Sequence, residues 1–158
     1  MTTQKISDWL SKTPTIVFVI LSLSSHIVWW ALLNAVIHVF SIDVGYITEP
    51  PKVNTAFEYI SAIIIIPMVE TLLSQKLPYW GLTKISYLKQ NIWIVFLISA
   101  TLFALLHFYS VAYIIYTFVV GLILIYSYHV RIKRHPFWTI TLIHSLFNTF
   151  FTVYKLLS

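Results

Sequence analysis

The run ISAIIIIPMVE, residues 60–70, is almost wholly apolar and ends in a carboxylate. Up to Val69 it is typical of a helix that crosses a membrane. An ionisable side chain at that depth is costly and normally faces a partner or a wet cavity. Glu70 is therefore the first candidate for a functional residue, and the segments that could supply its partners come next.

The composition excludes an ordinary soluble domain. Hydrophobic residues make up 59 % of the 158 residues and charged residues 9 %, whereas about a quarter of the residues of a soluble domain are charged. No repeat or long polar linker divides the chain, so we predict one integral membrane domain, residues 1–158. The net charge of +5 is explained by loop cations that set membrane orientation, and we expect lipid rather than nucleic acid as the surrounding partner.

Five apolar segments are candidates for membrane crossing, because about 20 residues at about 1.5 Å each span a hydrocarbon core of about 30 Å. We predict an all-α, polytopic transmembrane bundle of about five helices, with the segment 76–90 as an interfacial continuation of the second helix. The predicted spans are 14–40, 55–75, 91–110, 111–130 and 137–157.

The distribution of cations predicts a cytoplasmic N-terminus. If the N-terminus is cytoplasmic and the five segments cross in turn, eight of the ten lysines and arginines lie on the cytoplasmic side. Only Lys52 and Lys155 lie on the other side. Cytoplasmic loops are the ones enriched in lysine and arginine. The chain has no cysteine, which excludes disulfides, thiolate metal ligands and a cysteine nucleophile.

Two further apolar segments carry polar side chains at helical spacing. Phe103 and His107 are four residues apart, as are His144 and Asn148, so each pair shares one helical face. The alternative is that these groups only hydrogen-bond helices to one another, an interaction typically worth about 0.6 kcal/mol. A glutamate, two histidines and an asparagine together favour a reactive site over that alternative.

Hairpin geometry predicts that Glu70 and His107 meet. If the chain reverses near Lys89, Glu70 lies 19 residues before the turn and His107 lies 18 after it. A carboxylate beside an imidazole can activate a water molecule. His144 conflicts with this depth count, since it lies only seven residues into its own segment, and the site assembles only if helices are short, tilted or offset.

Three short motifs resemble the signatures of a known family. They are ETLLSQ (residues 70–75), FALLH (103–107) and HSLFN (144–148). In this order they resemble the Glu-Glu-x-x-x-Arg, Phe-x-x-x-His and His-x-x-x-Asn/Asp helices of the CAAX protease and bacteriocin-processing (CPBP, Abi) family of intramembrane proteases. The resemblance covers residues 55–155. Thr71 stands where the family has its second glutamate, and Gln75 stands where it has arginine.

The resemblance implies a glutamate-type intramembrane endopeptidase of a prokaryotic plasma membrane, with a membrane-associated protein or peptide as substrate. Glu70 and His107 would activate the attacking water, and His144 and Asn148 would stabilise the oxyanion of the tetrahedral intermediate. Supporting positions would be Thr71, Gln75 and Phe103.

Three alternatives stay open from the sequence. Glu70, His107 and His144 could instead ligate a divalent metal such as zinc, although we favour no cofactor and the His-Glu-x-x-His signature is absent. The same cavity could serve a non-catalytic membrane scaffold or a bacteriocin-immunity protein, or a proton-coupled transporter. An aspartyl dyad is excluded because the only aspartates, Asp8 and Asp43, lie outside the apolar segments.

Overall fold

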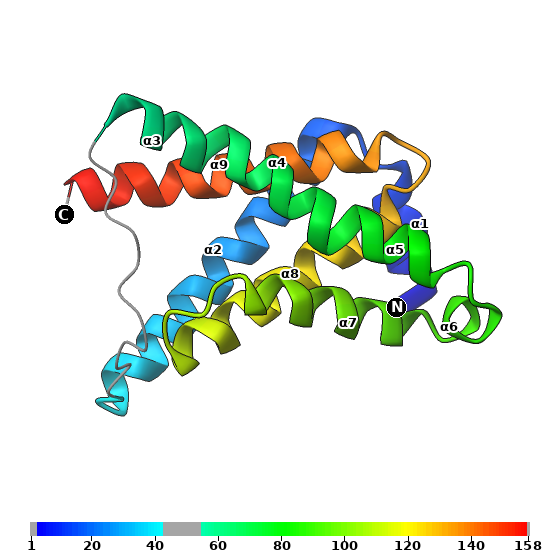
Figure 1. The fold of residues 1–158 in the computed structure, drawn as a ribbon, viewed down its shortest axis with the longest axis horizontal. Helices are drawn as coiled ribbons and strands as arrows, with labels where there is room; N and C mark the ends of the chain where they lie inside the picture. The colour runs from blue at the N-terminus through cyan, green and yellow to red at the C-terminus, as the bar shows by residue number, and fades with distance from the viewer. Residues whose placement is uncertain (1–2, 43–54, 158) are drawn as a thin grey trace.

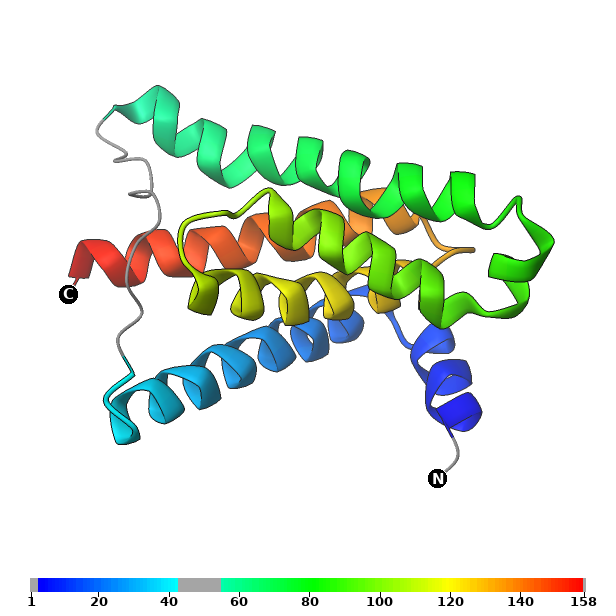
Figure 2. The same ribbon diagram turned by 60° about the horizontal axis from the view of Figure 1, so that its bottom comes forward.

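A computed structural model of the chain describes residues 3–42 and 55–157. In these ranges the protein is an all-α bundle of helices (Figures 1 and 2). Three helices are long and apolar enough to cross a membrane, namely Thr15–Val39, Ala56–Leu82 and Val111–Val130. The elements are α1 (Thr3–Lys12), α2 (Thr15–Val39), α3 (Ala56–Ile60), η1 (Ser61–Ile65), α4 (Ile66–Glu70), η2 (Thr71–Lys76), α5 (Leu77–Leu82), α6 (Ser86–Gln90), α7 (Ile92–Leu105), α8 (Val111–Val130) and α9 (Pro136–Leu157).

All five predicted segments are helical in the described residues, but only three of them are long and apolar enough to cross a membrane, and α1 is an additional helix. Two of the predicted lengths change. The second helix, α3 to α5, continues to Leu82, so much of the segment 76–90 is helix, as predicted, and only the short α6 is separate. The predicted span 91–110 is too long, because α7 ends at Leu105. Lys52, one of the two cations expected opposite the others, lies outside the described residues.

The first π-helical turn of the second helix, η1, arises where Pro67 interrupts the regular ladder. The N–H of Ile66 bonds to the carbonyl of Ser61, five residues back. Pro67 has no N–H and cannot serve the carbonyl of Ala62 in the same way. The side-chain amide of Asn148 on α9 donates to that carbonyl instead, at 2.9 Å. A backbone group that proline leaves open therefore becomes a docking point between helices.

The second π-helical turn, η2, also lies just before a proline. Pro78 cannot donate to the carbonyl of Ser74, four residues earlier, and Ser99 of α7 donates its hydroxyl to that carbonyl. The carbonyls of Ala62 and Ser74 thus connect the second helix to α9 and α7, respectively. Glu70 lies at the end of the short α4, between the two wide turns. Such π-turns are frequent at functional sites because they re-aim the side chains around them.

Helices α7 and α8 form a tight antiparallel hairpin. Gly121 allows the close approach, since a Cβ at that position would lie 3.0 Å from the Ala100 Cα and 3.2 Å from the Phe103 Cβ. The 14 residues of α7 extend only about 21 Å, less than the hydrocarbon core. The connection 106–110 follows, and Ser110 caps α8 by accepting a hydrogen bond from the Tyr113 N–H at 3.1 Å.

One end of the bundle carries the basic connections. Arg131, which is fully buried, donates to the Thr13 carbonyl at 2.8 Å and to the Thr15 hydroxyl at 2.7 Å, and so joins the end of α8 to the start of α2. The connection between α5 and α7 lies at this end as well, on the right of Figure 1 near the N-terminus. The described cations that gather there are Lys5, Lys12, Lys76, Lys84, Lys89, Arg131, Lys133 and Arg134.

Candidate active site

Glu70 lies between two imidazole rings contributed by different parts of the chain. Its Oε1 is 3.6 Å from the Nε2 of His107, and its Oε2 is 3.4 Å from the Nε2 of His144. The side chains are 14 %, 15 % and 4 % exposed, respectively, so the cluster is largely enclosed but open on the side of Glu70 and His107. The predicted meeting of Glu70 and His107 is what the structure shows, and His144 joins them in spite of the depth conflict. His107 lies two residues beyond the end of α7.

Phe103 positions both histidines. The carbonyl of Phe103 lies 2.9 Å from the Nδ1 of His107. Its ring is 4.7 Å from the His107 ring and 5.4 Å from the His144 ring, and it is only 1 % exposed. A backbone carbonyl only accepts hydrogen bonds, so the Nδ1 of His107 carries the proton. In the neutral ring, Nε2 is then an acceptor that faces Glu70.

This arrangement places two hydrogen-bond acceptors opposite each other. An ionised Glu70 Oε1 and the lone pair of His107 Nε2 cannot bond directly, and their separation of 3.6 Å reflects that. A water molecule has two protons and can donate one to each of two acceptors. The two facing acceptors are therefore suited to binding one water molecule between or beside them.

Asn148 lies on α9 one turn after His144, and its side-chain amide bonds to η1 of the second helix. One N–H of its amide is used by the Ala62 carbonyl. Because an amide nitrogen has two N–H groups, one donor stays available, and the side chain lines a cavity of the bundle. The bond of Asn148 to η1 is a role that the sequence did not indicate.

The supporting positions Thr71 and Gln75 are fully buried beside the cluster. The Thr71 hydroxyl and both polar atoms of the Gln75 amide hydrogen-bond to none of the described residues. The structure therefore does not connect them to Glu70. In place of the charged pair of the family signature, this chain has two neutral side chains in a closed layer of the bundle.

Sequence reasoning missed three residues around the site. The Tyr113 ring is 5.9 Å from the His107 ring, and Tyr109, whose ring is 5.4 Å from that of Tyr113, lies within electrostatic range of Glu70. His26 of α2 is fully buried and packs 4.9 Å from Phe147 of α9. The tyrosines gave no signal because they belong to the connection after α7 and the first turn of α8, segments that the sequence assigned to continuous spans.

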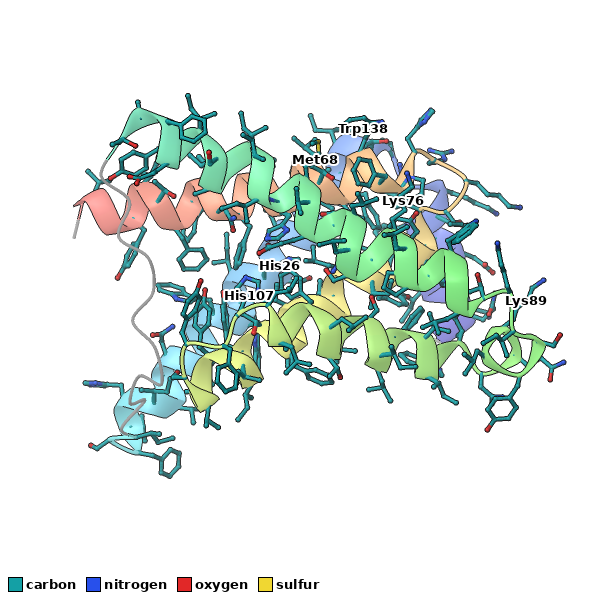
Figure 3. All side chains as sticks on the ribbon, in the orientation of Figure 1. His26, Met68, Lys76, Lys89, His107 and Trp138 are labelled. Atoms are coloured by element: carbon teal, nitrogen blue, oxygen red, sulfur yellow. The ribbon has the colours of Figure 1, made fainter. Side chains whose placement is uncertain are left out.

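A cavity of about 400 Å³ lies between α2, the start of α8 and the second half of α9. Its lining includes Asn148 and Tyr113 but none of Glu70, His107 and His144. Its other walls are mainly aromatic and aliphatic, from Trp30, Leu33, Ile37, Tyr116, Phe147 and Phe151. In Figure 3, His107 is labelled near the middle of the bundle, next to the label of His26 and well away from Lys89.

The residues that could hold a metal ion are the same three. A tetrahedral site needs their donor atoms to converge on one point with an open position. In the described part of the chain, no three histidine, aspartate or glutamate side chains are arranged in that way. Each histidine faces a different oxygen of Glu70 instead.

Comparison with protein families gives one match. The family model described as type II CAAX prenyl endopeptidase Rce1-like matches residues 52–150, which is more than half of the chain and includes all three motifs. No curated protein and no solved structure matches the chain.

Proposed function

Because the chain belongs to the type II CAAX prenyl endopeptidase Rce1-like family, we propose that it is an intramembrane endopeptidase that hydrolyses a peptide bond in a membrane-associated protein or peptide. The observation that carries this proposal is the position of the Glu70 carboxylate between the Nε2 atoms of His107 and His144. In this position the Glu70 carboxylate can act as a general base that activates water.

The nucleophile in this mechanism is a water molecule whose two protons point to Glu70 Oε1 and His107 Nε2. Its oxygen lone pair is then directed away from both, toward a substrate carbonyl. Glu70 takes the proton as the water oxygen attacks the carbonyl carbon. The same carboxyl group delivers that proton to the leaving nitrogen when the peptide bond breaks, so the carboxylate is regenerated.

The negative charge on the carbonyl oxygen requires donors. His144 offers its Nε2–H, which in the resting cluster is directed to Glu70 Oε2 at 3.4 Å. Asn148 offers the N–H that the Ala62 carbonyl leaves free. Donors that are already oriented in a low-dielectric site can lower a barrier by several kcal/mol, since they need no rearrangement during the reaction.

A divalent metal is the alternative source of an activated water. It would be held by Glu70, His107 and His144 and would lower the pKa of bound water. The tautomer of His107 fits both mechanisms, because a metal-ligating histidine also donates its other ring N–H to a carbonyl. The metal-free proposal needs only the side chains of the cluster. Treatment with a chelator separates the two mechanisms.

The test is peptide hydrolysis by purified protein in liposomes. The probe is a library of fluorescence-quenched peptides, each made with and without an isoprenyl group on an internal cysteine near the C-terminus. Glu70→Gln should abolish hydrolysis. Glu58→Gln is a matched control in the same long helix, because Glu58 forms the capping box with Thr55 and glutamine serves that motif as well.

Each outcome points to one function. Hydrolysis by wild type and Glu58→Gln but not by Glu70→Gln supports the endopeptidase. Equal hydrolysis by Glu70→Gln contradicts a glutamate mechanism. A folded wild-type protein that cleaves no peptide favours the scaffold, and uptake that depends on a pH gradient favours the transporter.

A further inference from the structure

One fully buried histidine has no part in the mechanism described above. His26 lies in the middle of α2, and its Nδ1 is 2.7 Å from the carbonyl of Ser22, one turn earlier in the same helix. Because a carbonyl only accepts hydrogen bonds, Nδ1 carries the proton of the neutral ring. The Nε2 of His26 is therefore an acceptor, and this buried atom hydrogen-bonds to none of the described residues.

His144 has an unpartnered nitrogen of the same kind. Its Nε2 lies 3.4 Å from Glu70 Oε2, and since an ionised carboxylate only accepts hydrogen bonds, the proton of the neutral His144 ring belongs on Nε2. The Nδ1 of His144 is then an acceptor as well. It is buried and has no hydrogen-bond partner among the described residues, and the whole residue is only 3 % exposed.

The rings of His26 and His144 lie in the same part of the bundle. The His26 ring packs 4.9 Å from the ring of Phe147, which follows His144 by three residues on α9, and residues at this spacing are neighbours on a helix surface. The two imidazoles are close enough to interact electrostatically. Helix α2 thus brings an unpartnered acceptor near the one nitrogen of His144 that does not face Glu70.

Two acceptors cannot hydrogen-bond to each other, and a buried acceptor that lacks a donor is costly. One water molecule resolves this conflict, because it can donate one proton to His26 Nε2 and the other to His144 Nδ1. A direct bond between the rings would need the proton on His144 Nδ1. The Nε2 lone pair of His144 would then face the Glu70 carboxylate, an arrangement of two acceptors that the water avoids.

We propose that His26 is a positioning residue for His144, and that the two rings hold one buried water molecule between His26 Nε2 and His144 Nδ1. This water keeps the proton of His144 on Nε2, because the hydrogen bond at one ring nitrogen decides which tautomer is present. The inference rests on the proposed function for its effect on catalysis, since His144 Nε2–H is the proposed oxyanion donor. The tautomer itself does not depend on that function.

The tautomer can be measured without turnover by nitrogen NMR of the protein in liposomes, with isotope-labelled histidine rings. Protonated and unprotonated ring nitrogens have well-separated chemical shifts, and the His144 signals are identified by their loss in His144→Gln. In the wild type we expect a protonated Nε2 and an unprotonated Nδ1 that receives magnetisation from water. A His144 ring protonated at Nδ1, or no transfer from water to that nitrogen, overturns the proposal.

Substitutions at His26 test whether it sets this tautomer. His26→Phe keeps a ring against Phe147 but removes the acceptor, so both tautomers of His144 should appear. His26→Gln places an amide oxygen where Nε2 was and should restore the single tautomer. The matched control is His38→Phe, at an exposed position of the same helix. An unchanged His144 tautomer in His26→Phe overturns the proposal.

Peptide hydrolysis measures the consequence for catalysis. His26→Phe should lower kcat by roughly tenfold or more with little change in KM, His26→Gln should recover most of the loss, and His38→Phe should match the wild type. A kcat that His26→Phe leaves unchanged overturns the positioning role. If the NMR results are as expected but the wild type cleaves no peptide, the proposed function fails while the water site and the His144 tautomer stand.

Discussion

The side-chain amide of Asn148 donates a hydrogen bond, at 2.9 Å, to the carbonyl of Ala62, 86 residues earlier in the chain. This bond exists because Pro67 cannot donate to that carbonyl, and it ties the helix that carries His144 to the helix that carries Glu70. The spacing between the Glu70 helix and the helix of His144 and Asn148 thus depends on a backbone group that a proline has left open.

Asn148→Ala should destabilise the protein by about 1 kcal/mol, because a carbonyl inside the bundle loses its donor. Pro67→Ala restores an N–H at the position that interrupts the ladder, so the cost of Asn148→Ala should be smaller in the Pro67→Ala background. Unfolding by titration with a denaturing detergent measures both differences. Strictly additive costs of the two changes would show that Asn148 does not compensate for Pro67.

Gly121→Ala tests the close approach of α7 and α8. The added Cβ would lie 3.0 Å from the backbone of Ala100, and overpacking of this kind costs about 1–3 kcal/mol. Gly81→Ala is the matched control, because a Cβ there meets nothing within 4 Å. Thermal unfolding should show a lower melting temperature for Gly121→Ala only; an unchanged value would contradict the tight hairpin.

The neutral pair Thr71 and Gln75 can be exchanged for the charged pair of the family signature. Gln75→Arg alone places an unpaired charge at a fully buried position, which should destabilise the protein by about 3–5 kcal/mol. Adding Thr71→Glu supplies a partner four residues earlier on the same face and should recover much of the loss. Stability is measured by detergent-induced unfolding, and a double variant no better than Gln75→Arg would show that the two positions do not face each other.

Chelation tests the metal-free mechanism. Dialysis against a strong chelator should leave peptide hydrolysis unchanged, since the base, the water site and the oxyanion donors are all supplied by side chains. The control is a second aliquot dialysed without chelator, and hydrolysis is followed with the same quenched peptides. Loss of activity that zinc restores would establish the alternative in which Glu70, His107 and His144 are ligands.

The substitution Phe103→Leu separates positioning from folding. Phe103 contacts both histidine rings, and leucine is apolar and helix-compatible but smaller, so the rings gain freedom while the helix persists. We expect a lower kcat with a modest change in KM, because Phe103 lies against the histidine rings and is only 1 % exposed. A change confined to KM would show that Phe103 acts on substrate binding instead.

The sequence by itself determined the helical class, the membrane setting and the residues of the cluster. Apolar run length, the low charge content and the spacing of four between paired residues are local properties, and they do not depend on how the helices pack. The count of residues on each side of Lys89 also sufficed to bring Glu70 and His107 to one depth, because helical rise is constant.

Only the tertiary structure decided how closely α7 approaches α8, what Asn148 bonds to and which helices surround the cavity. These features depend on contacts between residues far apart in the chain: Gly121 against Ala100, Asn148 against the carbonyl that Pro67 frees, and α2 against the start of α8 and the end of α9. In a membrane every backbone group needs a partner inside the protein, and the sequence does not state which distant side chain supplies it.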